Sequence, residues 1–160
     1  MVESTALEMR RGCKPTVGSN PTLSAMDLEQ MAGRLKIFFD GGCRPNPGQM
    51  QAAVVMRGVV HHVADLGRGT SEQAEWLALL HGLRVAQLAG ERDIVVLGDA
   101  AGVIAQANGA AKCRNLEYLE QFQRETAQFE RVRLRYIRRN QNLAGIALAK
   151  LAVLALAHRD

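Results

Sequence analysis

The chain has 160 residues, of which 48% are hydrophobic, and a formal charge of +4 at pH 7. This length suits one domain with a sizeable core, and the apolar fraction is ordinary for a soluble globular protein. The modest positive charge is compatible with a polyanionic partner but does not by itself require one. Cys13, Cys43 and Cys113 form no CxxC pair, which argues against a disulfide framework or a zinc site and favours a reducing, cytoplasmic setting.

The first 32 residues differ in composition from the rest. Glycine, proline, serine and threonine dominate residues 12–21 without helix or strand periodicity, so we expect a flexible leader at 1–32 and a single domain at 33–160. The leader lacks the apolar stretch of a secretory signal. The most apolar segment, residues 143–157, is short for a membrane span and contains Lys150, which predicts a buried helix and no membrane partner.

The elements expected after the leader alternate between strands and helices. A buried strand and two further strands joined around Gly58 form a meander, and Thr70 with Gln73 makes a capping box for the first helix. In chain order, the patterns predict strands at 35–39, 52–56 and 59–66, a helix at 71–89, a strand at 93–97, helices at 100–107 and 116–129, a strand at 131–137 and a helix from about Asn142.

This order predicts an α/β fold with a mixed five-stranded sheet flanked by helices. The meander is antiparallel, and the strands separated by helices join it in parallel through right-handed crossovers. Chemistry in such sheets gathers at the carboxyl ends of the central strands. Asp40 and Asp99 each follow a central strand, and Glu75 lies in the first turns of the first helix. We therefore expect the carboxylates of Asp40 and Asp99 to lie close together.

A cluster of three carboxylates has a specific chemistry. Like charges repel in a site shielded from water, so such a cluster takes up protons or binds a cation, and Mg²⁺ and Mn²⁺ prefer oxygen ligands. Two such ions about 4 Å apart can hydrolyse a phosphodiester. Taken singly, Asp40 is also explained by a turn, Glu75 by the helix dipole and Asp99 by a helix cap. The combination favours a two-metal phosphodiesterase.

Residues 35–156 resemble type 1 ribonuclease H, and in particular its compact, reverse-transcriptase-like branch. The resemblance rests on Phe38-Phe39-Asp40-Gly41-Gly42-Cys43-Arg44-Pro45-Asn46-Pro47-Gly48, on Gln73-Ala74-Glu75-Trp76-Leu77-Ala78-Leu79-Leu80-His81-Gly82-Leu83, on Leu97-Gly98-Asp99-Ala100, and on Ile137-Arg138-Arg139-Asn140-Gln141-Asn142-Leu143-Ala144-Gly145-Ile146-Ala147-Leu148-Ala149. The first two stretches are specific in combination, and the last is weaker.

The resemblance implies an RNase H-like fold and an endoribonuclease that cleaves the RNA strand of RNA–DNA hybrids. Asp40, Glu75 and Asp99 would be the catalytic acids and the ligands of two Mg²⁺ or Mn²⁺ ions. The partner would be the hybrid or another nucleic-acid duplex, bound by a monomer. The residues matching the family's substrate contacts are Gly41, Gly42, Cys43, Asn46, Glu72, Gln73, Arg138 and Arg139.

Four positions depart from the family's pattern. The fourth acid, which helps to hold the metal that activates water, would fall at Gly145. Ala100 replaces the serine that usually follows the third acid, and Glu72 replaces an asparagine that contacts substrate. The loop from Arg138 to Asn142 contains no histidine. These departures place the completeness of the metal site in question.

The glycine at 145 has two explanations. Glycine inside a helix costs about 1 kcal/mol relative to alanine, so close approach of another backbone would be a sufficient local reason for it. Alternatively, Asn142, Gln141 or an extra water completes the metal shell, because magnesium commonly keeps several waters. Asn142 is equally suited to capping the helix.

Arginines at 131, 133, 135, 138 and 139 place five positive charges within nine residues. They form either a phosphate-contacting stripe or an ordinary solvated strand face. Two functions remain from the sequence. The first is a metal-dependent endoribonuclease with three carboxylates, and the alternative is a catalytically impaired module that binds nucleic acid or protein. The three retained acids favour the enzyme, whereas Gly145, Ala100 and Glu72 favour the module.

Overall fold

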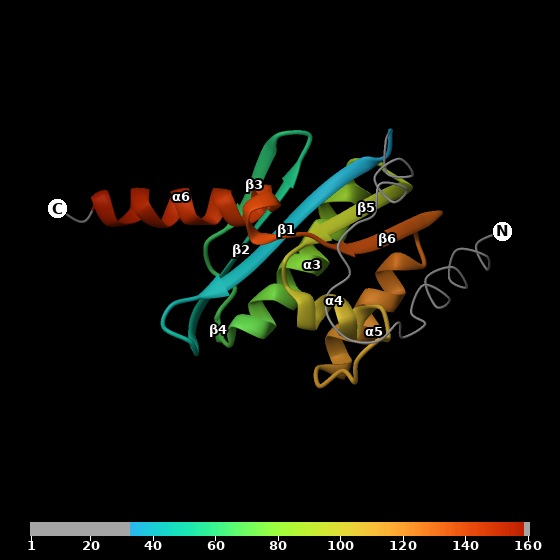
Figure 1. Cartoon of the computed structure of the whole chain (residues 1–160), viewed down its shortest axis with the longest axis horizontal. Helices are drawn as coiled ribbons and strands as arrows, with labels where there is room; N and C mark the ends of the chain where they lie inside the picture. Colours follow the sequence, from blue (N-terminus) through green and yellow to red (C-terminus); the bar gives the residue numbers. More distant parts are fainter. Residues whose placement is uncertain (1–32, 159–160) are drawn as a thin grey trace.

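The computed structural model describes residues 33–158 of the chain, so the predicted leader at 1–32 lies outside the described residues (Figure 1). The described elements are β1 (Leu35–Cys43), β2 (Gly48–Met56), β3 (Val59–Val63), β4 (Arg68–Gly69), α3 (Ser71–Leu88), β5 (Asp93–Gly98), α4 (Ala101–Ala107), α5 (Leu116–Thr126), β6 (Arg131–Tyr136), the 3₁₀ helix η1 (Arg139–Gln141) and α6 (Leu143–Ala157).

The sheet has the predicted mixed topology, with strand order β3-β2-β1-β5-β6. β1 pairs antiparallel with β2 and parallel with β5, and β5 pairs parallel with β6. The three-stranded meander and the two added parallel strands are thus confirmed. The sequence missed the two-residue strand β4, which pairs with the start of β2 and carries no periodicity of its own.

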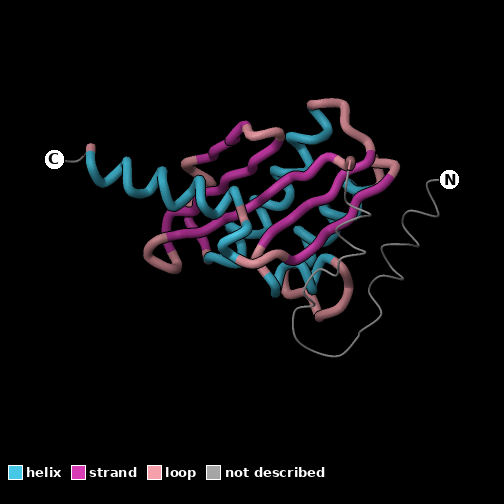
Figure 2. The backbone as a smooth tube through the Cα atoms, turned by 45° about the horizontal axis from the view of Figure 1, so that its top comes forward, coloured by secondary structure: helices cyan, strands magenta, loops and turns pink. Residues whose placement is uncertain are grey.

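Helices cover both faces of this sheet (Figure 2). α3 packs on β1 and β2, and α5 packs on α3, which encloses the main core around Trp76, Phe39 and Phe122. α6 lies on the opposite face, where Ala144 and Leu148 contact Ala53 and Val55 of β2. β2 is covered on both faces by these helices, which agrees with the continuous apolar sequence of residues 52–56.

The prediction that the last helix is buried is wrong. α6 has the predicted extent, but only Ala144 and Leu148 are buried, while Val153 and Leu156 are each 66% exposed. Figure 1 shows the reason, since α6 extends beyond the edge of the sheet and its second half has no element beneath it. Within residues 33–158, no helix is long and apolar enough to cross a membrane.

β1 is longer than its apolar run. The sequence predicts a strand that stops before Asp40, but β1 continues to Cys43 because residues 39–43 still pair with β2 after pairing with β5 has ended. The predicted strand at 59–66 ends instead at Val63, and the helix predicted to reach 129 ends at Thr126. Strand pairing and tertiary contacts, not hydrophobicity alone, determine these boundaries.

Candidate active site

The register of β1 and β5 brings Asp40 and Asp99 together. The last registered pair of these parallel strands is Phe38 with Leu97, and each acid lies two residues beyond it. Adjacent strands run about 4.8 Å apart, so the two carboxylates leave neighbouring backbones at the same end of the sheet. Phe39 packs directly against Gly98, where any Cβ would lie 2.5 Å from its ring. The expected juxtaposition is therefore present.

Gly41 brings the third acid to the same place. A Cβ at position 41 would lie 2.1 Å from the carbonyl oxygen of Ala74 and 2.8 Å from the backbone nitrogen of Glu75. Only a residue without a side chain permits this approach between β1 and α3. The first turn of α3, and Glu75 with it, is consequently held against the strand that carries Asp40.

The charges of neighbouring acids affect the pKa values of both Asp40 and Glu75. Burial raises the pKa of Asp40 to about 6, and the charge of Asp99 adds to the effect. Burial also raises the pKa of Glu75 to about 7, with further contributions from Asp40, Asp99 and Glu72. Arg139 opposes both shifts. Two carboxyl groups that resist ionisation in this way gain from a cation placed between them.

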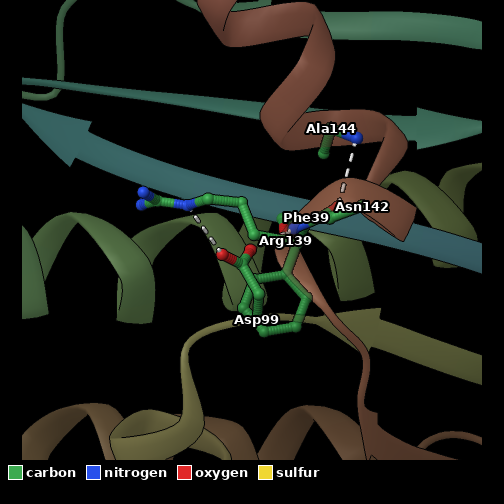
Figure 3. A network of polar contacts seen from close by, with 5 residues as sticks. All are labelled: Phe39, Asp99, Arg139, Asn142 and Ala144. Carbon is green, nitrogen blue, oxygen red and sulfur yellow. Dashed lines mark hydrogen bonds and ion pairs between the residues drawn. The ribbon is translucent and has the colours of Figure 1, made fainter.

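Asn142 forms hydrogen bonds with residues of three segments around the acids, namely Phe39 of β1, Asp99 after β5 and Ala144 of α6 (Figure 3). Its side chain is fully buried, and its Nδ2 donates to Oδ1 of Asp99 at 2.6 Å and to the carbonyl oxygen of Phe39 at 3.0 Å. Its Oδ1 accepts from the backbone N–H of Ala144 at 3.2 Å and so caps α6. Two acceptors on one side and a donor on the other define the amide orientation. Asn142 thereby ties β1, the end of β5 and α6 together.

Of the two roles left open for Asn142, the structure shows the helix cap, and the sequence did not reveal its bond to Asp99. No sequence pattern indicates it, because the two residues are 43 positions apart. The same side chain is a poor candidate for completing a metal shell, since its oxygen faces Ala144 and its N–H groups face the acid. The Oε1 of Gln141 likewise accepts from the backbone of Arg138.

Arg139 is a second partner of Asp99 that the sequence did not reveal. Its Nε donates to Oδ2 of Asp99 at 3.3 Å, from η1 just before Asn142 (Figure 3). The Asp99 side chain is 12% exposed, whereas that of Arg139 is 92% exposed. Both oxygens of Asp99 are thus bonded, one from inside the protein and one from its surface.

The donor set fits a divalent cation only in part. Buried carboxylates with raised pKa values are suitable hard oxygen ligands for Mg²⁺ or Mn²⁺. However, among residues 33–158 no three Asp, Glu, His or Cys side chains are gathered closely enough to form a metal cage. In addition, the bonds of Asp99 to Asn142 and Arg139 engage the oxygens that a cation would need.

Position 145 faces the acids. A Cβ there would lie 3.4 Å from Oδ2 of Asp40 and 3.8 Å from the Cβ of Asn142. These are side-chain neighbours, so close approach of another backbone does not explain the glycine. A Cβ at position 145 would therefore fit at ordinary van der Waals distance from Asp40, in the first turn of α6.

Two of the predicted substrate contacts lie at the end of β1, with Cys43 its last residue and Asn46 in the turn that follows. The Oδ1 of Asn46 accepts from the backbone N–H of Ser71 at 3.1 Å, and the Cys43 thiol lies 3.5 Å from Oδ1 of Asn46 and from the carbonyl oxygen of Gly69. These bonds join the turn to the N-terminus of α3. A Cβ at Gly42 would meet nothing within 4 Å, so its backbone is open to a ligand.

Two other predicted contacts, Glu72 and Gln73, are engaged within the protein. Gln73 completes the predicted capping box, since its Oε1 accepts from the backbone N–H of Thr70 and its own N–H donates to the Thr70 hydroxyl. The Oε1 of Glu72 accepts from Nε2 of Gln106 at 2.7 Å, which links α3 to α4. Substrate contact by either side chain would compete with these bonds.

The basic residues extend along β6 toward the acids, and the last of them, Arg139, contacts Asp99. Arg131, Arg133 and Arg135 alternate with the buried Val132 and Leu134, as predicted, along the edge strand β6. Arg138 and Arg139 follow at the carboxyl end of that strand. Positive charge therefore runs along one edge of the sheet to the acidic site, an arrangement suited to a polyanion.

An α/β fold of this topology, with three acids at one end of the sheet, defines an RNase H-like protein, and comparison with known families agrees. The profile of the family described as reverse transcriptase-like matches residues 38–152. The chain therefore belongs to the type 1 ribonuclease H family, within its reverse-transcriptase-like branch.

Two curated relatives support this membership. Ribonuclease HI of Halobacterium salinarum is 36% identical over 99 residues, which cover 58% of this chain and 50% of that protein. The bifunctional protein Rv2228c of Mycobacterium tuberculosis is 31% identical over 133 residues, which cover 78% of this chain and 36% of that protein. The chain thus matches half or less of the length of these relatives.

Solved structures share the fold, and the match covers most of the length of each of them. RNase H1 from Halobacterium salinarum superimposes with a TM-score of 0.67 at 27% identity, covering 72% of this chain and 94% of that one. The N-terminal RNase H domain of Rv2228c gives 0.63 at 30% identity, covering 76% and 98%. LC11-RNase H1, solved in complex with an RNA/DNA hybrid, gives 0.59 at 25% identity, covering 69% and 89%.

Proposed function

We propose that the chain is a metal-dependent endoribonuclease that hydrolyses the RNA strand of RNA–DNA hybrids. The observation that carries this proposal is the meeting of Asp40, Glu75 and Asp99 at one end of the sheet in a common electrostatic field. Family membership and the hybrid bound by LC11-RNase H1 support the substrate class. The activity, substrate and metals are proposals for this chain, which matches only part of its curated relatives.

In this proposal, Asp40 and Glu75 hold the cations, and Asp99 joins them once its outer oxygen is free. Bound Mg²⁺ or Mn²⁺ would supply Lewis-acid activation of water and of the scissile phosphate. Asn142 keeps Asp99 oriented toward the site. The arginines after β6 bind the backbone of the duplex, and the open backbone at Gly42 allows close approach of a strand.

The direct test is cleavage of a labelled RNA–DNA hybrid in Mg²⁺ and then in Mn²⁺, with Asp40→Asn as the control. Cleavage by the native chain that disappears in Asp40→Asn establishes a nuclease with three carboxylates. Equal cleavage by both proteins would mean that these acids are not the active site. A matched labelled DNA duplex tests whether the RNA strand is required.

A second candidate function is a nuclease-derived module that binds nucleic acid without cutting it. The engagement of both Asp99 oxygens and the missing side chain at Gly145 favour it. Absence of cleavage in either metal, combined with retention of the labelled hybrid in a gel-shift assay, would support this candidate over the enzyme.

Restoring a carboxylate on α6 separates the two candidates further. Gly145→Asp introduces an acid at the position that faces Asp40, and Ile146→Asp introduces one at the next residue, whose side chain is 38% exposed on the same turn. Cleavage gained by either variant would show that the scaffold supports catalysis and that a fourth ligand limits it. No gain would mean that the lost acid is not the limiting feature.

We also propose that the protein acts as a monomer in a reducing, cytoplasmic setting. Cys43 and Cys113 are free thiols buried in the described domain, which suits a compartment that keeps thiols reduced. Analytical ultracentrifugation of the full chain tests the oligomeric state.

A further inference from the structure

The contact between Arg139 and Asp99 lies where a cation would have to bind. Asp99 has one oxygen committed inside the protein, because Oδ1 accepts the 2.6 Å hydrogen bond of the buried Asn142. Its other oxygen, Oδ2, accepts from Nε of Arg139. Oδ2 is therefore the oxygen of Asp99 that remains for a metal ion, and it already has a positively charged partner.

The two ends of this ion pair differ in exposure. Asp99 is held by a buried hydrogen bond and is mostly covered, whereas 92% of the Arg139 side-chain surface is open to solvent. Water and salt ions compete for an exposed guanidinium, which weakens its ion pair. Arg139 can therefore leave Asp99 at small cost while Asp99 stays in place.

We propose that Arg139 and a divalent cation bind Asp99 in mutual exclusion, so that Arg139 acts as a tethered counter-ion that weakens cation binding at the site. The inference rests on the proposed function, because it assumes that the acids hold a divalent cation. It follows from the requirement of both partners for the same atom, Oδ2 of Asp99. Arg139 accordingly acts on cation binding through Asp99.

Arg139 acts on the other acids as well. The positive charge of Arg139 acts to lower the pKa of Asp40 and of Glu75, against the effect of burial and of the neighbouring carboxylates. Arg139 therefore provides part of the counter-charge that a bound cation would provide. Removing the guanidinium frees Oδ2 of Asp99 and leaves all three carboxylates without this counter-charge. Both effects favour a divalent cation.

The test is direct binding of Mn²⁺ to the full chain, measured by isothermal titration calorimetry without nucleic acid. Arg139→Ala is compared with the native chain and with Arg138→Ala, which removes the same charge from the adjacent exposed residue. Arg139→Lys retains the positive charge but lacks the Nε–H donor. Far-UV circular dichroism confirms that each variant is folded.

We expect Arg139→Ala to bind Mn²⁺ about two- to fivefold more tightly than the native chain, the range that corresponds to loss of an exposed ion pair. Arg138→Ala should change the affinity less, and Arg139→Lys should fall between the native chain and Arg139→Ala. Unchanged or weaker binding by Arg139→Ala would overturn the inference. An equal effect of Arg138→Ala would also overturn it, since net charge alone would then explain the gain.

The experiments distinguish failure of this inference from failure of the proposed function. If the native chain cleaves the hybrid and Arg139→Ala binds Mn²⁺ no more tightly, the nuclease stands and the role of Arg139 is rejected. If no variant binds Mn²⁺ and none cleaves, both proposals fail together.

Discussion

The two sides of the acidic site are held in different ways. On the β1–α3 side, backbone atoms meet at Gly41, and Asp40 accepts a hydrogen bond from the backbone of Gly41. The charges of neighbouring acids act on both Asp40 and Glu75. On the β5–α6 side, Asp99 is bonded at both oxygens by Asn142 and Arg139.

This difference shows how a site can position charges with or without neutralising them. A close backbone contact positions Asp40 and Glu75 without neutralising them, so burial and, to a smaller extent, the charges of neighbouring acids raise the pKa of each. Side-chain hydrogen bonds position Asp99 and satisfy it at the same time. A cation would therefore relieve more repulsion at Asp40 and Glu75 than at Asp99. The hydrogen bonds of Asp99 limit how readily a cation can bind to its carboxylate.

The largest expected effect is at the backbone contact. Gly41→Ala places a methyl group 2.1 Å from the carbonyl oxygen of Ala74, so α3 must move away from β1. We expect a loss of about 1–3 kcal/mol in the free energy of unfolding, as for other overpacked sites, together with loss of hybrid cleavage. Urea denaturation measures the stability.

Gly42→Ala is the matched control for that substitution, because its Cβ meets nothing within 4 Å. We expect its unfolding midpoint in urea to stay close to that of the native chain. Similar losses in the two variants would show that backbone entropy, and not the contact with α3, is responsible, and the proposed difference between the two sides would be lost.

The next effect is at Asn142, which holds the other side. Asn142→Ala removes the helix cap and the donor to Asp99, and loss of the cap alone costs about 1 kcal/mol. Asn142→Ser keeps a capping oxygen but removes the amide donor. We expect both variants to lose cleavage by about 10- to 100-fold, as for residues that orient metal ligands, while Asn142→Ser retains more stability. Equal activity of Asn142→Ser and the native chain would show that Asp99 needs no such support.

The raised pKa values predict a pH effect on stability without added metal. Asp40 and Glu75 titrate near pH 6 and 7 in the folded protein, above their ordinary values of 3.8 and 4.5. The folded state therefore binds more protons than the unfolded state between about pH 4 and 7, and stability falls as pH rises through this window. The double variant Asp40→Asn/Glu75→Gln should thus have a higher Tm than the native chain at pH 8.

The comparison at low pH completes this experiment. At pH 4 the two native carboxyl groups are largely protonated in the folded protein, so the difference in Tm should narrow. A difference that is the same at both pH values would mean that the double variant stabilises the protein through packing and not through relief of repulsion. Adding Mn²⁺ at pH 8 should stabilise the native chain more than the variant, because only the native chain keeps all three acids.

The smallest effect is expected at Glu72, whose charge contributes to raising the pKa of Glu75. Glu72→Gln removes this charge and keeps an oxygen that can accept the hydrogen bond from Gln106. We expect the pKa of Glu75 to fall slightly in an NMR titration of its carboxyl carbon. Glu120→Gln, exposed on α5, is the control, and an equal shift there would show that only net charge is being measured.

The sequence alone was sufficient to predict the order of the main strands and helices and the meeting of Asp40 with Asp99. Hydrophobic runs and helical spacing are local signals, and the ends of adjacent parallel strands lie at the same edge of a sheet. Asp40 and Asp99 therefore had to be neighbours once β1 and β5 were recognised as central strands. The capping box at Thr70 and Gln73 was local in the same way.

Only the tertiary structure decided how those acids are held. The contacts of Gly41 with Ala74 and of Asn142 with Asp99 join residues far apart in the chain, so no local pattern indicates them. The exposure of α6 depends on where the sheet beneath it ends, which its uniformly apolar sequence does not reveal. Whether Oδ2 of Asp99 meets Arg139 or solvent is likewise determined by the path of η1, because a charged side chain on a loop has no periodicity that locates its partner.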